Sequence, residues 1–209
     1  MTFAESLRAR AQALGLTLPE VVADADDPLR HATVPSVMAI RDPLEVGMCP
    51  WPGDLYFDGW GQGVQFVDGQ TSDEDELARI AHAWHSGVPV REIHAMAQYS
   101  SLGPLAEAAE QGAEEVIAAG WRYLRALAVE AELPQFQEMV EAAYAEPRLR
   151  RHFPFTGMRE VSFLDKVLPF GRTLVKIVPA QPGFNVLAGE EIHYAATPQE
   201  AVEHALRRL

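Results

Sequence analysis

The chain has 209 residues, enough for one well-buried core or for two small lobes that share one. Hydrophobic residues make up 48% of the chain and charged residues 22%, which excludes a disordered or low-complexity protein. The net charge of −13 argues against a nucleic-acid-binding protein, because phosphate binding needs a concentrated positive field.

The N-terminal segment and the cysteine content bear on the cellular compartment. Glu5 and Arg8 place charge where a signal peptide needs an apolar core, and no stretch approaches the roughly 20 apolar residues of a membrane span. The single cysteine, Cys49, excludes an internal disulfide. We therefore expect a cytoplasmic protein without membrane contact, metal or cofactor, and its oligomeric state stays open.

The charge is distributed unevenly along the chain. Residues 1–145 hold 8 Lys/Arg and 23 Asp/Glu, a balance of −15, whereas residues 146–209 hold 9 and 7, a balance of +2. We expect most of the acidic residues to lie on solvated helix faces, where they favour solubility.

The first third of the chain predicts one helix and then strands. The spacing of Phe3, Leu7 and Ala11 is typical of an amphipathic helix over residues 3–14. A polar loop over 18–30 follows, then a strand over 34–41 and a run of turn formers over 42–53. Two strands over 55–57 and 63–67, separated by glycines, predict a hairpin.

The rest of the chain predicts helices, then strands, then a last helix. Helices are expected over 73–86, 104–131 and 134–146, with Gly112 able to break the second, and residues 90–97 form a short element of either type. Strands are expected over 160–164, 173–178, 184–187 and 192–194. Thr197, with Pro198 at the first helical position and Glu200 completing a capping box, predicts the start of the final helix.

This order of elements predicts the fold class. Strands followed by helices, strands and a helix indicate an α+β protein with an antiparallel sheet, rather than alternating βαβ units. Its hairpins lie near 34–67 and 160–194, and they pack with a central helical segment and a C-terminal helix. We expect a single domain over 1–209, with two lobes, 1–100 and 101–209, as the alternative. A duplicated ββα unit is a weaker interpretation.

Histidines and the cysteine are the first candidates for chemistry. His82 and His85 share a helix face and His94 lies nearby, but no third ligand stands at a characteristic spacing, which favours ordinary surface histidines over a metal site. Cys49 lies in a Pro-rich segment without a helix start to activate its thiol, so a buried structural residue is the better interpretation.

An aromatic and acidic run forms the second candidate. Asp54, Tyr56 and Asp58 alternate along an extended segment, so they share one face, and Trp60 follows. Two carboxylates and a phenol on one face have the chemistry for acid–base catalysis. An exposed strand face and a turn explain the two Asp residues equally well.

A basic segment forms the third candidate. Arg148, Arg150, Arg151 and His152 stand out within an acidic chain, and a guanidinium cluster could bind a carboxylate or phosphate. The competing interpretation, which we favour, is that these arginines neutralise acidic helix faces or stabilise a helix C-terminus. We expect the phenylalanines that follow to anchor the segment in the core.

Several segments of the chain carry a resemblance to a known family. The firmest is Glu146-Pro147-Arg148-Leu149-Arg150 with Phe153-Pro154-Phe155, and weaker ones include Gly59-Trp60 and Trp121-Arg122-Tyr123-Leu124. Together they resemble an uncharacterised bacterial family that carries a domain of unknown function and is often labelled a natural product biosynthesis protein. The resemblance implies a context in secondary metabolism and no particular catalytic residue.

Two functions are compatible with these patterns. The first is a non-catalytic accessory or binding protein that binds a small molecule or a protein partner. The second is a cofactor-independent biosynthetic enzyme that uses Asp54, Tyr56 or His152 as acid–base groups in a pocket near Trp60. The residues we expect to bind a ligand are Tyr56, Trp60, Arg148, Arg151 and His152, where the basic segment meets the aromatic strand.

Overall fold

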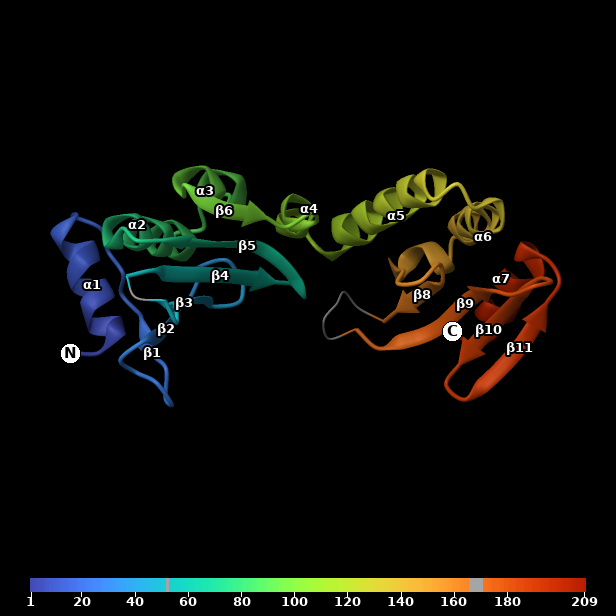
Figure 1. Cartoon of the computed structure of the whole chain (residues 1–209), viewed down its shortest axis with the longest axis horizontal. Coiled ribbons are helices and arrows are strands. Elements are labelled where there is room, and N and C mark those ends of the chain that lie inside the picture. Colours follow the sequence, from blue (N-terminus) through green and yellow to red (C-terminus); the bar gives the residue numbers. More distant parts are fainter. Residues whose placement is uncertain (52, 166–170) are drawn as a thin grey trace. The chain divides into compact units, whose positions relative to one another are not determined.

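A computed structural model describes residues 1–51, 53–165 and 171–209, and they form two compact units. The N-terminal unit is Met1–Gly112 and the C-terminal unit is Ala113–Leu209. Each unit contains an antiparallel sheet with helices, so the expectation of an α+β fold with a C-terminal helix is confirmed (Figure 1).

The part of the N-terminal unit that the structure describes is a six-stranded meander with four helices. Its helices are α1 (Phe3–Ala13), α2 (Glu74–His85), α3 (Val90–Met96) and α4 (Ala106–Gln111). Its strands are β1 (Val22–Ala23), β2 (His31–Val34), β3 (Leu44–Met48), β4 (Leu55–Gly61), β5 (Val64–Thr71) and β6 (Tyr99–Leu102). The strands follow one another across the sheet in chain order, and every neighbouring pair is antiparallel.

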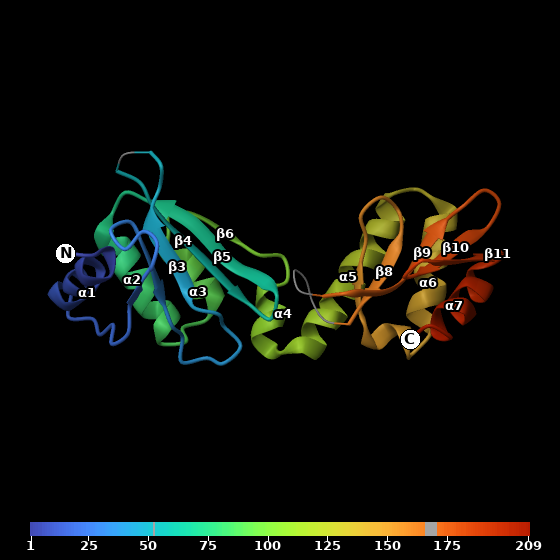
Figure 2. The same cartoon turned by 90° about the horizontal axis from the view of Figure 1, so that it is seen from below.

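Helices α2 and α3 lie along one side of the N-terminal sheet (Figures 1 and 2). Burial alternates strictly along β4, so Leu55 and Phe57 face this helical layer while the residues between them face the other way. Such alternation is typical of an antiparallel sheet with one face on the core and one face toward water.

The closest packing in this layer is between β4 and the indole of Trp84 on α2. Trp84 is fully buried, its Nε1–H donates to the Asp42 carbonyl at 3.2 Å, and Phe66 meets it edge to face. A Cβ at Gly59 would lie 2.6 Å from the indole ring. The absence of a side chain at Gly59 therefore lets the helix approach the strand.

Replacing Gly59 by Ala is expected to destabilise the N-terminal unit by about 1–3 kcal/mol, because overpacking forces Trp84 out of its position. Urea unfolding followed by circular dichroism measures this change. The control is Gly53→Ala, where a Cβ meets nothing within 4 Å but the backbone φ is +90°. Because Gly59 has no such φ, backbone strain does not add to its cost, and a Gly59→Ala variant as stable as the unchanged chain would show that the indole moves aside without cost.

Two local predictions in this unit were wrong. A strand was expected over 34–41, but β2 ends at Val34. Pro35 lacks an N–H, and the Ser36 hydroxyl accepts a hydrogen bond from the Met38 amide in a local turn. The turn-rich run over 42–53 contains β3, because Leu44 and Val46 face the core. The element of either type over 90–97 is helix α3.

In the described residues of the C-terminal unit, a five-stranded sheet packs with three α-helices and one 3-10 turn. Its helices are α5 (Ala113–Glu130), α6 (Pro134–Ala145), η1 (Leu149–Arg151) and α7 (Pro198–Leu206). Its strands are β7 (Phe153–Phe155), β8 (Val161–Leu164), β9 (Thr173–Pro179), β10 (Phe184–Ala188) and β11 (Glu191–Ala195). They lie in the order β11-β10-β9-β8-β7, and Gly112, at φ +118°, separates α4 from α5 as expected.

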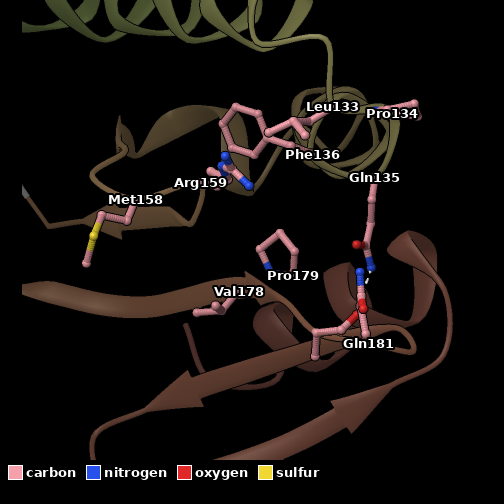
Figure 3. Close-up of a pocket in the computed structure, with 10 residues that line it drawn as sticks. Leu133, Pro134, Gln135, Phe136, Met158, Arg159, Val178, Pro179 and Gln181 are labelled. Atoms are coloured by element: carbon pink, nitrogen blue, oxygen red, sulfur yellow. Dashed lines mark hydrogen bonds between the residues drawn. The ribbon is translucent and has the colours of Figure 1, made fainter.

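Gln135 joins helix α6 to the turn between β9 and β10 (Figure 3). Its Nε2 donates to the carbonyl of Ala180 at 3.0 Å and to that of Gly183 at 2.7 Å. Since both acceptors belong to one turn, a single side-chain amide fixes the start of α6 against the sheet.

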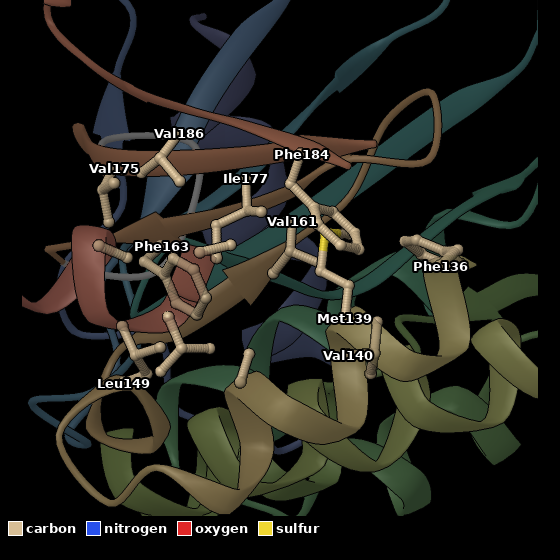
Figure 4. Packing of buried hydrophobic residues seen from close by; sticks show 14 of the residues in the cluster. Phe136, Met139, Val140, Leu149, Val161, Phe163, Val175, Ile177, Phe184 and Val186 are labelled. Atoms are coloured by element: carbon tan, nitrogen blue, oxygen red, sulfur yellow. The ribbon is translucent and has the colours of Figure 1, made fainter. Parts of the chain in front are cut away.

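One hydrophobic core fills the space between the helices and the C-terminal sheet (Figure 4). Figure 4 shows Met139 and Val140 of α6 on the side of the helix that faces Val161 and Ile177 of the sheet. Trp121 of α5 and the small residues of α7 complete the same cluster.

The start of α7 is capped as the sequence predicts, with one difference. The Thr197 hydroxyl accepts from the Glu200 amide at 3.2 Å, which confirms Thr197 as the N-cap. The Glu200 carboxylate accepts from the amide of Ala196 at 2.8 Å, one residue before the position that a capping box uses.

Candidate functional site

A row of carboxylates crosses the N-terminal sheet on the face opposite its helices. The strand registers pair Glu45 of β3 with Asp58 of β4, Asp58 with Asp68 of β5, and Asp68 with Ser101 of β6. Directly opposite residues of an antiparallel pair project on the same face with Cβ atoms about 5 Å apart. Three acidic side chains therefore lie side by side on adjacent strands, and the last is beside a hydroxyl.

A second row with aromatic rings runs beside the carboxylate row. The registers pair Gly47 with Tyr56, Tyr56 with Gln70, and Gln70 with Tyr99. At the other end of this row the Tyr56 hydroxyl lies 3.1 Å from Nδ1 of His31. A Cβ at Gly47 would lie within 3 Å of both the His31 and Tyr56 rings, so glycine makes room for this contact.

The two rows line an open hollow of about 670 Å³. Its lining includes Tyr56, Asp58, Gln70 and Tyr99. Asp68 and Ser101 also line it, and Tyr99 is 67% exposed. We call this face, with Glu45 at its edge, the acidic sheet face.

The charges on the acidic sheet face are not compensated by nearby basic residues of its own strands. Residues 42–78 contain nine Asp and Glu and neither Lys nor Arg. Burial and the charge on Asp58 raise the pKa of Asp68 against the opposing effect of its hydrogen bonds, which include one with Ser101. Burial, Glu45 and Asp58 likewise raise the pKa of Tyr56, so its hydroxyl stays protonated.

The remaining members of the predicted aromatic and acidic run, Asp54 and Trp60, do not line this hollow. Trp60 is half-buried on β4, its carbonyl accepts from the Asp42 amide, and its side chain is not part of the lining. The Asp54 carbonyl accepts from the Cys49 amide at 2.8 Å. Cys49 is buried in the wall, and burial followed by the charge on Asp54 raises its thiol pKa, which disfavours a nucleophilic thiolate.

The basic segment belongs to the C-terminal unit, whereas Tyr56 and Trp60 belong to the N-terminal unit. Arg148 donates to the Leu206 carbonyl at the end of α7 at 3.3 Å, and Arg150 lies over the Tyr144 ring at 5.4 Å. These two arginines have partners within their own unit.

The other two members of the basic segment, Arg151 and His152, lack side-chain partners of this kind in the described residues. Arg151 is exposed, and its side chain makes no hydrogen bond or ion pair within the ranges that the structure describes. His152 is half-buried, and its amide donates to the Leu149 carbonyl. The phenylalanines anchor the segment in part, because Phe153 is buried while Phe155 is 39% exposed.

The three histidines near α2 each have a separate contact. Nδ1 of His82 lies 2.9 Å from the Thr17 carbonyl, and that of His85 lies 2.8 Å from the Pro35 carbonyl. Nδ1 of His94 lies 2.7 Å from the Ser100 hydroxyl. Within residues 1–51, 53–165 and 171–209, no group of three or more His, Cys, Asp or Glu is arranged to hold a metal ion.

Sequence reasoning missed half of the acidic sheet face. The strand expected over 63–67 stops short of Asp68, but β5 continues through Asp68 and Gly69 to Thr71. Glu45 lay in the segment assigned to turns, and β6 was not predicted. The absence of Lys and Arg from 42–78 is the signal that could have indicated an acidic face.

Comparison with known proteins relates only the C-terminal unit to a family. Residues 115–209 match a family of unknown function (DUF6193). No curated protein and no solved structure matches the chain. None of the helices in the described part of the chain has the length and apolar character that crossing a membrane requires. The C-terminal unit is therefore similar to an uncharacterised domain.

Proposed function

We propose that this chain is a non-catalytic accessory or binding protein whose acidic sheet face binds a positively charged group of a small molecule or protein partner. The observation that carries this proposal is the alignment of Glu45, Asp58 and Asp68 on three adjacent strands. Like charges placed directly opposite each other destabilise a sheet. A fold usually keeps such an unfavourable arrangement only where it serves a function. A bound cation would remove the repulsion between the carboxylates.

The groups around the carboxylates favour an organic cation over a bare ion. Tyr56 and Tyr99 lie in the row next to the carboxylates, and aromatic faces attract ammonium and guanidinium groups. Gln65 donates to the Asp58 carboxylate at 3.0 Å, which holds that carboxylate in place. An amine or guanidinium over Asp58 and Asp68 would gain charge-assisted hydrogen bonds to both.

Binding of spermidine and agmatine to the whole chain tests this proposal. We expect NMR shifts at β4 and β5 amides, and an affinity that falls as NaCl rises, because salt screens exposed charges. Asp58→Asn combined with Asp68→Asn should weaken binding roughly tenfold or more, since it removes two charged acceptors. The matched control is Glu92→Gln, an exposed acid of α3. An equal loss of affinity in the control would show that only the net charge of the protein matters, and would contradict a binding site on the acidic sheet face.

The single substitution Asp68→Asn is expected to stabilise the protein, by about 0.2–1 kcal/mol, because it removes repulsion from Asp58 and keeps a polar group beside Ser101. Folded Asp68 has a pKa above the ordinary 3.8, so the native state keeps this proton to higher pH than the unfolded chain. The increase in the free energy of unfolding that Asp68→Asn brings is therefore largest above the raised pKa and disappears below pH 3.8. Urea unfolding at several pH values measures it, and a destabilised variant at neutral pH would contradict the repulsion.

A cofactor-independent biosynthetic enzyme is the second candidate, favoured by one observation. The pKa of Asp68 is raised beside a second carboxylate, Asp58, and such pairs divide the roles of acid and base. The resemblance to proteins labelled natural product biosynthesis proteins would place either function in that context. Mass spectrometry of a bound natural amine after incubation separates the two functions, because a binding protein returns the compound unchanged.

A further inference from the structure

The C-terminal unit contains a pocket of about 310 Å³ that is separate from the acidic sheet face (Figure 3). Its walls are the start of α6, the loop between β7 and β8, and the end of β9 with the turn that follows. This volume lies at the lower end of the range for small-molecule sites, so it suits a small ligand.

The pocket wall is largely apolar and contains one charged side chain. Leu133, Phe136, Val178 and Pro179 supply apolar surface. Arg159 is the one charged side chain among the described residues that line it, and Figure 3 shows Arg159 on the same side of the pocket as Phe136. The described residues of the lining include no acid in a chain of net charge −13, so the charge at this wall favours a negatively charged group.

The guanidinium of Arg159 is available to a ligand. Arg159 is exposed and makes no hydrogen bond or ion pair with any part of the chain that the structure describes. The neighbouring acid, Glu160, is engaged elsewhere: one carboxylate oxygen lies 3.7 Å from Lys176 Nζ, and the other accepts from the Met158 amide at 2.7 Å. The carboxylate that could neutralise Arg159 from the next position therefore has its own partners.

The two sides of the pocket are held in a fixed arrangement. The double hydrogen bond from Gln135 to Ala180 and Gly183 ties the start of α6 to the turn after β9. The turn is closed by the Ala180 amide, which donates to the Gly183 carbonyl at 2.8 Å. A pocket whose walls are already in place loses little entropy when a ligand binds.

We propose that this pocket binds a small carboxylate that carries an apolar chain or ring. The carboxylate pairs with the Arg159 guanidinium, whose fork of donors matches both carboxylate oxygens. The apolar part lies against Phe136 and Val178. This site goes beyond the proposed cation binding, because it takes a ligand of the opposite charge in the other unit.

The test is a titration of the full chain with 3-phenylpropionate, monitored by NMR at the Gln135 side-chain amide and at Arg159 Nε. We expect saturable shifts at both groups, and at least roughly tenfold weaker binding of the uncharged amide, 3-phenylpropionamide. Arg159→Gln should weaken carboxylate binding by a similar factor. The matched control Arg122→Gln removes an exposed arginine of α5 and should leave binding unchanged.

Two further variants keep the outcomes distinguishable. Arg159→Lys keeps the charge but loses the fork, so we expect intermediate affinity. The double variant Asp58→Asn with Asp68→Asn should bind 3-phenylpropionate normally, which separates this site from the acidic sheet face. Absence of shifts at Gln135, equal binding of acid and amide, or an Arg159→Gln variant that binds like the unchanged protein would each overturn the proposal.

Discussion

Replacement of Arg41 by Ala is expected to lower the free energy of unfolding of the N-terminal unit by about 3–5 kcal/mol, the usual cost of breaking a buried ion pair. The Arg41 side chain is fully buried and pairs with Glu110 of α4. It also donates to the Val88 carbonyl at 2.6 Å and lies over the Trp84 ring at 4.8 Å. Its loss leaves the Glu110 carboxylate only with the Val90 amide, at 3.2 Å.

Urea unfolding measured by circular dichroism checks this expectation. The control is Arg91→Ala, which breaks an ion pair with Glu107 in the same unit but at the solvent-exposed surface, where the loss of stability should be much smaller than for Arg41→Ala. Arg41→Ala combined with Glu110→Gln should recover part of the stability, because no unpaired charge remains buried. A loss below about 1 kcal/mol for Arg41→Ala alone would mean that water reaches Glu110 and replaces the guanidinium.

Replacement of Trp121 by Ala is expected to destabilise the C-terminal unit by about 3–5 kcal/mol, the range for large aromatic residues in cores. The indole is 1% exposed and packs against the rings of Tyr144 and Phe163 at 5.5 and 6.1 Å. Its Nε1–H donates to the Arg150 carbonyl at 3.1 Å, which fixes the 3-10 turn to α5. The variant therefore loses core packing and the anchor of the basic segment together.

Hydrogen exchange resolves where this loss falls. We expect reduced protection of the amides in η1 and β8, with the amides of β3 to β5 unchanged, because they belong to the other compact unit. Trp121→Phe keeps most of the apolar contact but loses the donor, so it should cost less. Tyr123→Ala on the same helix, 61% exposed in the native chain, is the matched control. Similar losses for Tyr123→Ala and Trp121→Ala would show that helix α5 is destabilised in general.

Local signals predicted the helices well, because each helix has its start and end encoded within a few residues. Thr197 and Pro198 mark the start of α7, and Gly112 separates α4 from α5 as the pattern allowed. Strand β3 was not predicted, because Pro43 and Gly47 are typical of turns. Leu44 and Val46 form a strand because they are buried against helix α2, which lies far along the chain. Tertiary packing overrides local propensity at such positions.

The candidate site was predictable only in part, for a related reason. Tyr56 and Asp58 alternate within one strand, so their shared face follows from the sequence. Their neighbours Glu45 and Asp68 come from other strands, and only the register brings them opposite Asp58. A shift of the register by one residue would turn these side chains to the other face, and sequence spacing does not determine the register.

The lack of Lys and Arg between Arg41 and Arg79 makes the acidic sheet face accessible to a chemical footprint. Trypsin cleaves after Lys and Arg, so complete digestion leaves residues 42–79 as one peptide that spans β3, β4 and β5. A carbodiimide with a small amine modifies exposed carboxylates, and this single peptide then carries the labels of Glu45, Asp58 and Asp68. A cation bound at the face protects these three positions, so its occupancy is read as a mass change in one peptide.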